Sequence, residues 1–177
     1  MSVDGPWLQG LPAQVGEDCR VLVLGSMPGD ASLSAARYYA HPRNRFWPVM
    51  ATLCGFDPGL AYEQRLAALQ QAGVGLWDVI GRCRRRGSLD ASIVAGSEQA
   101  NDLPRLLASL PSVRAVAFNG AKAAQSFRRH VQGQLPEGTR SSLAWLALPS
   151  TSPANAGSSV QVLTEQWRVL APWLRHP

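Results

Sequence analysis

Short apolar runs alternate with segments of helical periodicity along most of this chain. Four of the runs have the length and the leucine or β-branched content of buried strands. They cover residues 20–24, 74–80, 113–118 and 144–148. Strands that alternate with helices are joined by crossovers, which place helices on both faces of a mostly parallel sheet. The sequence therefore predicts an α/β fold whose sheet is covered on both sides.

Apolar residues at helical spacing occupy most of the connections between these runs. The predicted helices cover residues 45–54, 62–73, 103–110, 121–130 and 160–174. Asn101 or Asp102 is predicted to be the N-cap of the third helix. Residues 1–15, rich in proline and glycine, are expected to form a loosely ordered lead-in, and the arginine-rich residues 81–90 a connection. A chain of 177 residues can bury one sizeable core, so we expect a single domain over 1–177.

Polar residues lie close to the end of each predicted strand. They are the turn 26–29, Asp78, Asn119 and the segment 150–155. The carboxyl ends of parallel strands meet at one edge of the sheet, and open α/β sheets bind their ligands there. Four separate segments are therefore expected to converge on one crevice.

The charge of the chain favours a polyanionic partner. Lysine and arginine total 17 against 12 acidic residues, which gives a formal net charge of +5. The basic residues are densest at 82–86 and 128–130. Three well separated cysteines fit neither a disulfide framework nor a four-cysteine metal or iron-sulfur site, and we expect no metal and no cofactor.

No apolar run approaches the roughly 20 residues that a membrane span requires. The first seven residues also lack the basic region and the apolar core of a signal peptide. We therefore expect a cytoplasmic protein with no membrane partner, and a monomer.

The segment 38–47 combines aromatic rings, cations and one amide, a mixture that suits a nucleobase held beside a phosphate backbone. Tyr39 is predicted to stack on the base. Phe46 is either a core residue or a second base contact, and Arg43 is a candidate for DNA binding. Asn44 is either the N-cap of the following helix or the residue that orients a catalytic water.

Two further candidates lie at strand ends. The turn 25–29 matches neither a dinucleotide fingerprint nor a P-loop, because the spacing fails and no lysine follows. Ser26 in this turn could hold a phosphate or a water, and the alternative is a plain strand-to-helix turn. Asp78 ends an apolar strand, where an unpaired carboxylate is costly. It either pairs with a cap or an arginine, or accepts an N–H from a base edge.

The late segment is small, polar and stiffened by proline, which suits contact with a DNA backbone. Its candidate DNA-binding residues are Ser150, Ser152, Pro153, Ala154 and Asn155. Lys122, the only lysine of the chain, is either a further DNA contact or an exposed first-turn residue. Schiff-base lyase chemistry would need this lysine at the sugar, and we do not expect it.

Taken together, these residues resemble the uracil-DNA glycosylase superfamily, within it the mismatch-specific thymine/uracil branch and the hypoxanthine-DNA glycosylase branch. The similarity runs from about residue 21 to residue 173. Its most specific part is similar to the HPxNRFW segment of the mismatch-specific enzymes and reads His41-Pro42-Arg43-Asn44-Arg45-Phe46-Trp47. The resemblance implies a three-layer α/β/α sandwich with a central four-stranded parallel sheet.

The resemblance also implies roles for several residues. Tyr39 corresponds to the ring that stacks on the flipped base, Asp78 to the strand end that reads its polar edge, and 153–155 to the loop that enters the duplex. The mismatch-specific enzymes carry a water-activating amide at the position of Met27, which cannot polarise water and remains only a base contact. The hypoxanthine branch shares the GSxPG turn and has its functional asparagine in the aromatic loop, which implies Asn44 as the catalytic amide. We include Ser26 with Asn44 among the candidate catalytic residues.

We therefore expect a monofunctional DNA glycosylase that flips and hydrolytically removes a deaminated base. Hypoxanthine is favoured, and uracil or mismatched thymine are further candidates. The expected partner is double-stranded DNA with a damaged or mismatched base. A lesion-recognising protein without catalysis is the first alternative, suggested by the missing turn asparagine. A nucleotide-using α/β enzyme, suggested only by topology, is the second.

Overall fold

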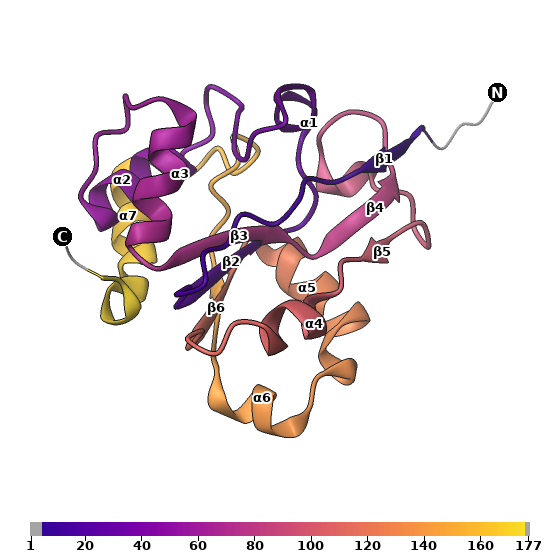
Figure 1. Ribbon diagram of the computed structural model, residues 1–177. Helices are drawn as coiled ribbons and strands as arrows, with labels where there is room; N and C mark the ends of the chain where they lie inside the picture. Colours follow the sequence, from indigo (N-terminus) through magenta and orange to yellow (C-terminus); the bar gives the residue numbers. More distant parts are fainter. Residues whose placement is uncertain (1–4, 176–177) are drawn as a thin grey trace.

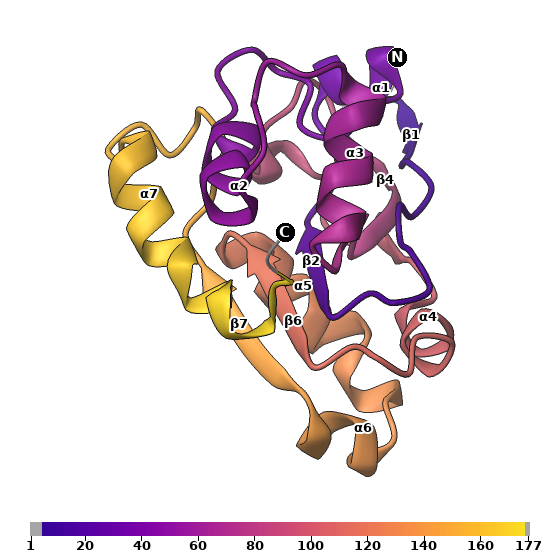
Figure 2. The same ribbon diagram turned by 60° about the vertical axis from the view of Figure 1, so that its left-hand side comes forward.

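Four parallel strands form the central sheet of this protein, whose computed structural model describes residues 5–175 (Figures 1 and 2). In spatial order they are β3 (Val74–Asp78), β2 (Val21–Gly25), β6 (Ala115–Asn119) and β7 (Ala144–Leu148). Val21 lies opposite both Val74 and Ala115, so the central strands start level. Their carboxyl ends consequently meet at one edge. The predicted α/β fold with a four-stranded parallel sheet between helices is confirmed.

The side chains of β2 show why helices cover both faces of this sheet. Val21 and Val23 point to one face and Leu22 and Leu24 to the other, and all four are fully buried. The first face packs against α2 (Phe46–Cys54), α3 (Tyr62–Gln71) and α7 (Val160–Trp167). The second face packs against α4 (Leu103–Ala108) and α5 (Ala121–His130), as Figures 1 and 2 show.

The remaining helical elements are short. They are α1 (Asp30–Ala35), α6 (Glu137–Ser142) and the 3-10 turns η1 (Asp90–Ser92), η2 (Gln132–Gln134) and η3 (Arg168–Trp173). The final predicted helix is thus α-helical only to Trp167 and continues as a 3-10 turn. Asp102 is the N-cap of α4, because its side chain accepts the Arg105 N–H at 3.2 Å. Within residues 5–175, no helix is long and apolar enough to cross a membrane.

A second, antiparallel sheet lies beside the central one. Its order is β1 (Trp7–Gln9), β4 (Ile80–Arg84) and β5 (Gln99–Ala100). The arginine-rich stretch predicted as a connection therefore begins with a strand. The lead-in also differs from the prediction, since β1 pairs with β4 and Gln14 bridges Leu76. Residues 1–4 of that lead-in lie outside the described residues.

Candidate active site

The polar segments that follow β2, β3, β6 and β7 do converge at one edge of the central sheet. Gly25 lies opposite Asp78 at the ends of β2 and β3, and Asn119 lies opposite Leu148 at the ends of β6 and β7. The aromatic loop joins them, because the N–H of Arg45 donates to the carbonyl of Thr151 at 3.0 Å. Distant segments therefore meet at this edge and are held together by hydrogen bonds, as their predicted convergence requires.

The amide of Asn44 has a defined orientation. Its Oδ1 accepts the backbone N–H of Phe46 at 2.9 Å and the hydroxyl of Thr151 at 2.9 Å. A backbone N–H can only donate, so the oxygen of the amide must face Phe46. The N-cap of α2 is Arg45, so Asn44 is not the N-cap that the sequence offered as one alternative: it lies one residue earlier and its side chain closes a turn onto the first residue of the helix. No hydrogen bond of its Nδ2 group occurs within the described part of the chain, so the group left for a ligand is a donor.

Thr151 connects Asn44 to the end of β6 and is completely buried. Its N–H donates to Asn119 Oδ1 at 2.9 Å, and Asn119 Nδ2 donates back to Thr151 Oγ1 at 3.0 Å. With one lone pair used in this way, the threonine hydroxyl donates its proton to Asn44. Sequence reasoning included Thr151 only as part of the segment 150–155 and gave it no role of its own. A hydroxyl residue two positions after Pro149, which directly follows β7, was the available signal in the sequence.

Tyr39 sits in a strained backbone conformation beside this amide. Its φ is +54°, in the left-handed region that bulky residues rarely adopt. The ring stacks on Phe46 with centroids 3.9 Å apart and an interplanar angle of 22°. Phe46 is fully buried, so it packs against one face of the tyrosine ring as a core residue and does not face a ligand. Strain of this kind persists only where the surroundings enforce it, and it clusters at binding and catalytic sites.

The carboxyl group of Asp78 is buried next to this tyrosine. Asp78 is 4% exposed, and neither its Oδ2 nor the hydroxyl of Tyr39 has a hydrogen-bond partner among the described residues. A Cβ at Gly25 would overlap Asp78 Oδ1 and lie 3.6 Å from the Tyr39 hydroxyl, so glycine permits this close approach. Burial, reinforced by the charge of Asp90 and opposed by Arg85, raises the pKa of Asp78 to about 7.

The turn after β2 is engaged by the segment that follows β4. The Ser26 hydroxyl donates to Asp90 Oδ1 at 2.6 Å. The buried guanidinium of Arg85 donates to the carbonyl of Pro28 at 2.6 Å, while its Nε and Nη1 have no partner within the described residues. Met27 packs with Ile80 and Cys83 in a separate apolar cluster. The structure thus places the side chains of this turn in internal contacts and not at the Asn44 amide.

Arg45 shapes the late loop and was also missed by sequence reasoning. Its guanidinium donates to the carbonyl oxygens of Thr151, Ser152, Asn155 and Ser158. Four carbonyl groups are thereby turned inward, which fixes the path of the loop beside Asn44.

The loop residues predicted to bind DNA lie around this arginine. The Oγ atoms of Ser150 and Ser152 accept the backbone N–H groups of Ser152 and Ala154, so both hydroxyl protons remain available to donate. Asn155 Nδ2 binds the Ser150 carbonyl at 2.9 Å, and Ala154 is exposed. Arg43 is exposed in the neighbouring aromatic loop.

Lys122 lies in a different cluster from the other candidates. Its Nζ binds Glu98 Oε1 at 2.5 Å, and His130 Nε2 lies 2.8 Å from the other oxygen of the same carboxylate.

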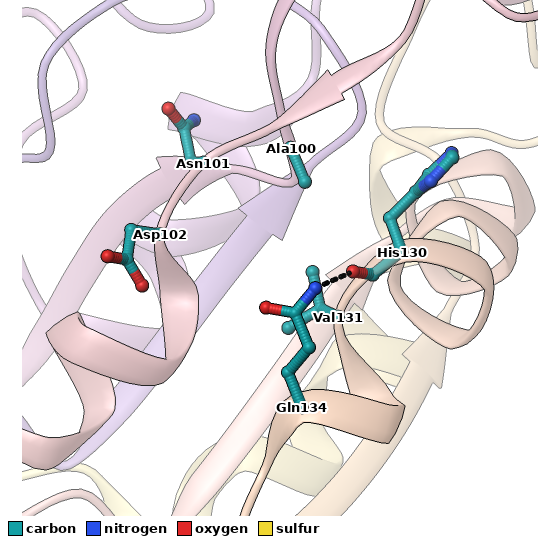
Figure 3. A pocket seen from close by; sticks show the side chains of 6 residues that line it. All are labelled: Ala100, Asn101, Asp102, His130, Val131 and Gln134. Atoms are coloured by element: carbon teal, nitrogen blue, oxygen red, sulfur yellow. Dashed lines mark hydrogen bonds between the residues drawn. The ribbon is translucent and has the colours of Figure 1, made fainter.

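His130 also lines a cavity of about 410 Å³ whose other lining residues are Ala100, Asn101, Asp102, Val131 and Gln134 (Figure 3). Asn44, Tyr39 and Asp78 do not line this cavity, so it is separate from the candidate active site. In the described part of the chain, no three His, Cys, Asp or Glu residues are grouped so as to hold a metal ion.

Comparison with known proteins identifies relatives of this arrangement. A family model described as the uracil DNA glycosylase superfamily matches residues 12–171. Two curated relatives, from Methanosarcina barkeri and Methanosarcina acetivorans, are both named hypoxanthine DNA glycosylase. They are 37% and 38% identical over 118 residues, which are 66% of this chain and 73% of each relative. The matched family region contains every strand end and loop described above.

A solved structure resembles most of this chain. It is a solution NMR structure from Methanosarcina acetivorans that carries the provisional name of a uracil DNA glycosylase. The two structures share a TM-score of 0.75 and 32% identity, over 93% of this chain and 99% of the other.

Proposed function

Since this chain belongs to the uracil-DNA glycosylase superfamily, we propose that it hydrolyses the N-glycosyl bond of a deaminated base in double-stranded DNA, with hypoxanthine favoured. DNA glycosylase activity in general is supported by the family and by the name of the two curated relatives. Hypoxanthine as the base, and hydrolysis without lyase chemistry, are our proposal. Lys122, which lyase chemistry would need, binds Glu98.

One observation carries the proposal: the amide of Asn44 is held by hydrogen bonds at the strand edge, near the strained Tyr39 and the buried Asp78. The three side chains offer a donor, a ring face and a titratable acid. A flipped base presents a carbonyl oxygen, a π-face and ring nitrogens, which are the complementary features.

The orientation of Asn44 changes the role that the sequence suggested. Oδ1 already accepts two hydrogen bonds, so it does not polarise a water. We assign Nδ2 to donate to O6 of hypoxanthine, where negative charge grows as the glycosyl bond breaks. A donor aimed at developing charge lowers the barrier by several kcal/mol in other enzymes, typically about 3. Water then adds to a sugar cation that has already formed, and needs little activation.

Asp78 acts as a neutral acid in this scheme. A carboxylate would repel the departing base, whereas a protonated Asp78 donates to a ring nitrogen of the base. Its burial and its pKa near 7 support the neutral form at physiological pH. When the bond breaks, the base keeps the electron pair and takes the proton of Asp78, which is then replaced from solvent. The attacking water supplies the hydroxyl of the abasic sugar and loses its second proton to solvent.

The late loop would keep the duplex open during this reaction. Pro153 and Ala154 lie at its tip and are suited to fill the space left by the flipped nucleotide. The hydroxyl groups of Ser150 and Ser152 are suited to donate to phosphates on either side. Unstacking costs a few kcal/mol and costs least at a mismatched or damaged pair, which favours deaminated bases.

The test uses labelled duplexes that carry deoxyinosine, deoxyuridine or thymine opposite guanine. We expect abasic sites to form fastest from deoxyinosine, and at least about 100-fold more slowly with Asn44→Ala. Release that is equal in wild type and variant would remove Asn44 from the mechanism.

A lesion-recognising protein without catalysis is the second candidate. The observation that favours it is the packing of Met27 at the turn position where the mismatch-specific branch carries its water-activating amide. Tight, lesion-selective binding with no base released from any of the three duplexes would select this function.

A further inference from the structure

The strand β4 and the two residues after it sort the arginines of residues 82–86 onto two faces. Cys83 and Arg85 are buried, whereas Arg82 and Arg86 are exposed and Arg84 is partly exposed. This alternation is that of a strand with one face on the protein and one toward solvent. Three of the four guanidinium groups therefore belong to the outer face.

An exposed tryptophan braces this outer face. Trp7 in β1 lies opposite Arg84 and is 47% exposed. Its ring centroid is 4.4 Å from Cζ of Arg82 and 6.0 Å from Cζ of Arg84. Stacking on an indole restricts a long side chain without neutralising its charge. The cation of Arg82 is thus held in position for a partner.

The outer face is attached directly to the candidate active site. β4 begins two residues after Asp78, and the segment beyond β4 holds the turn after β2 through Asp90 to Ser26 and Ser88 to the Asp30 N–H. At about 3.3 Å per residue, Arg82 and Arg86 lie no more than about 13 and 26 Å of chain from Asp78. These lengths correspond to about four to eight base pairs of a duplex.

We propose that the outer face formed by Trp7 of β1, Arg82 and Arg84 of β4 and the following Arg86 binds the phosphates of the duplex that flanks the flipped nucleotide. The proposal rests on the proposed function for its partner. It extends the DNA contacts beyond the loop 150–155 to the strand that follows Asp78.

Charge and shape favour DNA as the occupant of this face. No aspartate or glutamate occurs between Asp78 and Asp90 in the sequence, so every charged residue of this stretch is an arginine. Guanidinium groups match the geometry of phosphate oxygens, and a row of them at alternate positions follows an extended backbone. An acidic protein is the competing occupant, and the experiment below separates the two.

The experiment compares two duplexes with an unreactive abasic analogue at their centre, one of about 25 base pairs and one of about 7. The shorter one extends only about 10 Å to either side of the analogue, which is less than the roughly 13 Å of extended chain from Asp78 to Arg82. Dissociation constants are measured by fluorescence anisotropy over a salt series for wild type and Arg82→Gln. Arg128→Gln removes the same charge from an exposed position on α5 and is the matched control.

We expect Arg82→Gln to weaken binding of the long duplex by about 3- to 10-fold and to lower its salt slope by about 0.9. The short duplex should bind both proteins equally, and Arg128→Gln should leave both constants unchanged. Unchanged binding of the long duplex by Arg82→Gln, which an acidic protein as the natural partner would predict, overturns the proposal. Equal losses on both duplexes, or an equal loss with Arg128→Gln, also overturn it.

The same preparations are assayed for base release. A length-dependent loss of binding together with no excision from any lesion would leave this DNA-binding face intact and refute the proposed function. Excision of a base together with length-independent binding would do the reverse.

Discussion

The turn 25–29 and the aromatic loop 38–47 both follow β2, but they treat their polar groups in opposite ways. In the turn, the Ser26 hydroxyl is bound by Asp90 and Met27 lies in an apolar cluster. In the loop, Asn44 uses only its oxygen for internal contacts, and Tyr39 is held in a strained conformation. We therefore propose that the first segment has a structural role and that the second provides the donor and the ring that a base would contact.

This difference indicates where a catalytic amide can lie when the turn after β2 has none. An amide at position 27 would be aimed by the backbone of a tight turn. The amide of Asn44 instead depends on Phe46 and Thr151, which come from two different segments. Activity in this chain is therefore expected to be sensitive to the loops 38–47 and 149–158 and insensitive to the turn.

The largest expected effect is that of Asn44→Asp. A carboxylate at this position still accepts the N–H of Phe46 and the hydroxyl of Thr151, but it has no Nδ2 to donate. We expect the rate of deoxyinosine excision to fall at least about 100-fold while the melting temperature changes little. Single-turnover excision and thermal unfolding measure the two quantities. Activity within a few-fold of wild type would show that the oxygen of Asn44, and not its Nδ2, is what matters.

Features that depend on neighbouring residues could be predicted from the sequence, whereas contacts between residues far apart in the sequence could not. The helix at 121–130 and the strand at 144–148 have the predicted bounds because strong local periodicity and the flanking Gly120 and Pro149 define them. Patterns of this kind need no knowledge of the rest of the molecule. The prediction that Asn44 could be an N-cap was wrong by one residue, because Arg45 is the N-cap of α2 and Asn44 binds the N–H of Phe46 from the position before it.

The contacts that sequence reasoning missed are all between distant segments. Thr151 binds Asn44 from 107 residues away, and Arg45 reaches the late loop over a similar separation. β4 was missed because only Cys83 is apolar between Arg82 and Arg86, so its pairing with β1 decides its conformation. No periodicity encodes such pairings.

The pH dependence of the reaction tests the neutral form of Asp78. Its pKa in the folded protein is raised to about 7 by burial, so the acid that the mechanism uses is lost as pH rises through that value. We expect the single-turnover rate of excision to be highest below pH 7 and to fall about 10-fold per pH unit above it. Asp78→Asn, which cannot ionise, should remove this decline. A rate that rises through pH 7 in the wild type would contradict the assignment.

The same group makes a prediction for stability. An unfolded aspartate has a pKa of about 3.9, so between about pH 4 and pH 7 the folded state binds more protons at Asp78 than the unfolded state does. Its contribution to the free energy of unfolding is therefore greatest below pH 4 and declines as pH rises to 7. Chemical denaturation across this interval should show a smaller decline in Asp78→Asn than in wild type.

A smaller effect is expected from Thr151→Val, which keeps the shape of the side chain and removes its hydroxyl. Asn44 Oδ1 and Asn119 Nδ2 would each lose a partner in a buried site, which costs about 1 to 3 kcal/mol of unfolding free energy. The less restrained amide should slow turnover about 10-fold, with little change in KM. Thr151→Ser should restore both turnover and stability. If turnover stays at the wild-type rate while stability falls, the threonine holds the loop without positioning the amide.

The smallest effect is expected from Ser26→Ala, the corresponding test of the turn. The hydroxyl of Ser26 donates to Asp90, so its removal leaves a carboxylate oxygen that is exposed enough to bind water instead. We expect the excision rate to change by less than about 3-fold and the unfolding free energy by about 1 kcal/mol. If Ser26→Ala instead slowed excision by about tenfold or more, the turn would take part in the chemistry, and the contrast between the two segments would fail.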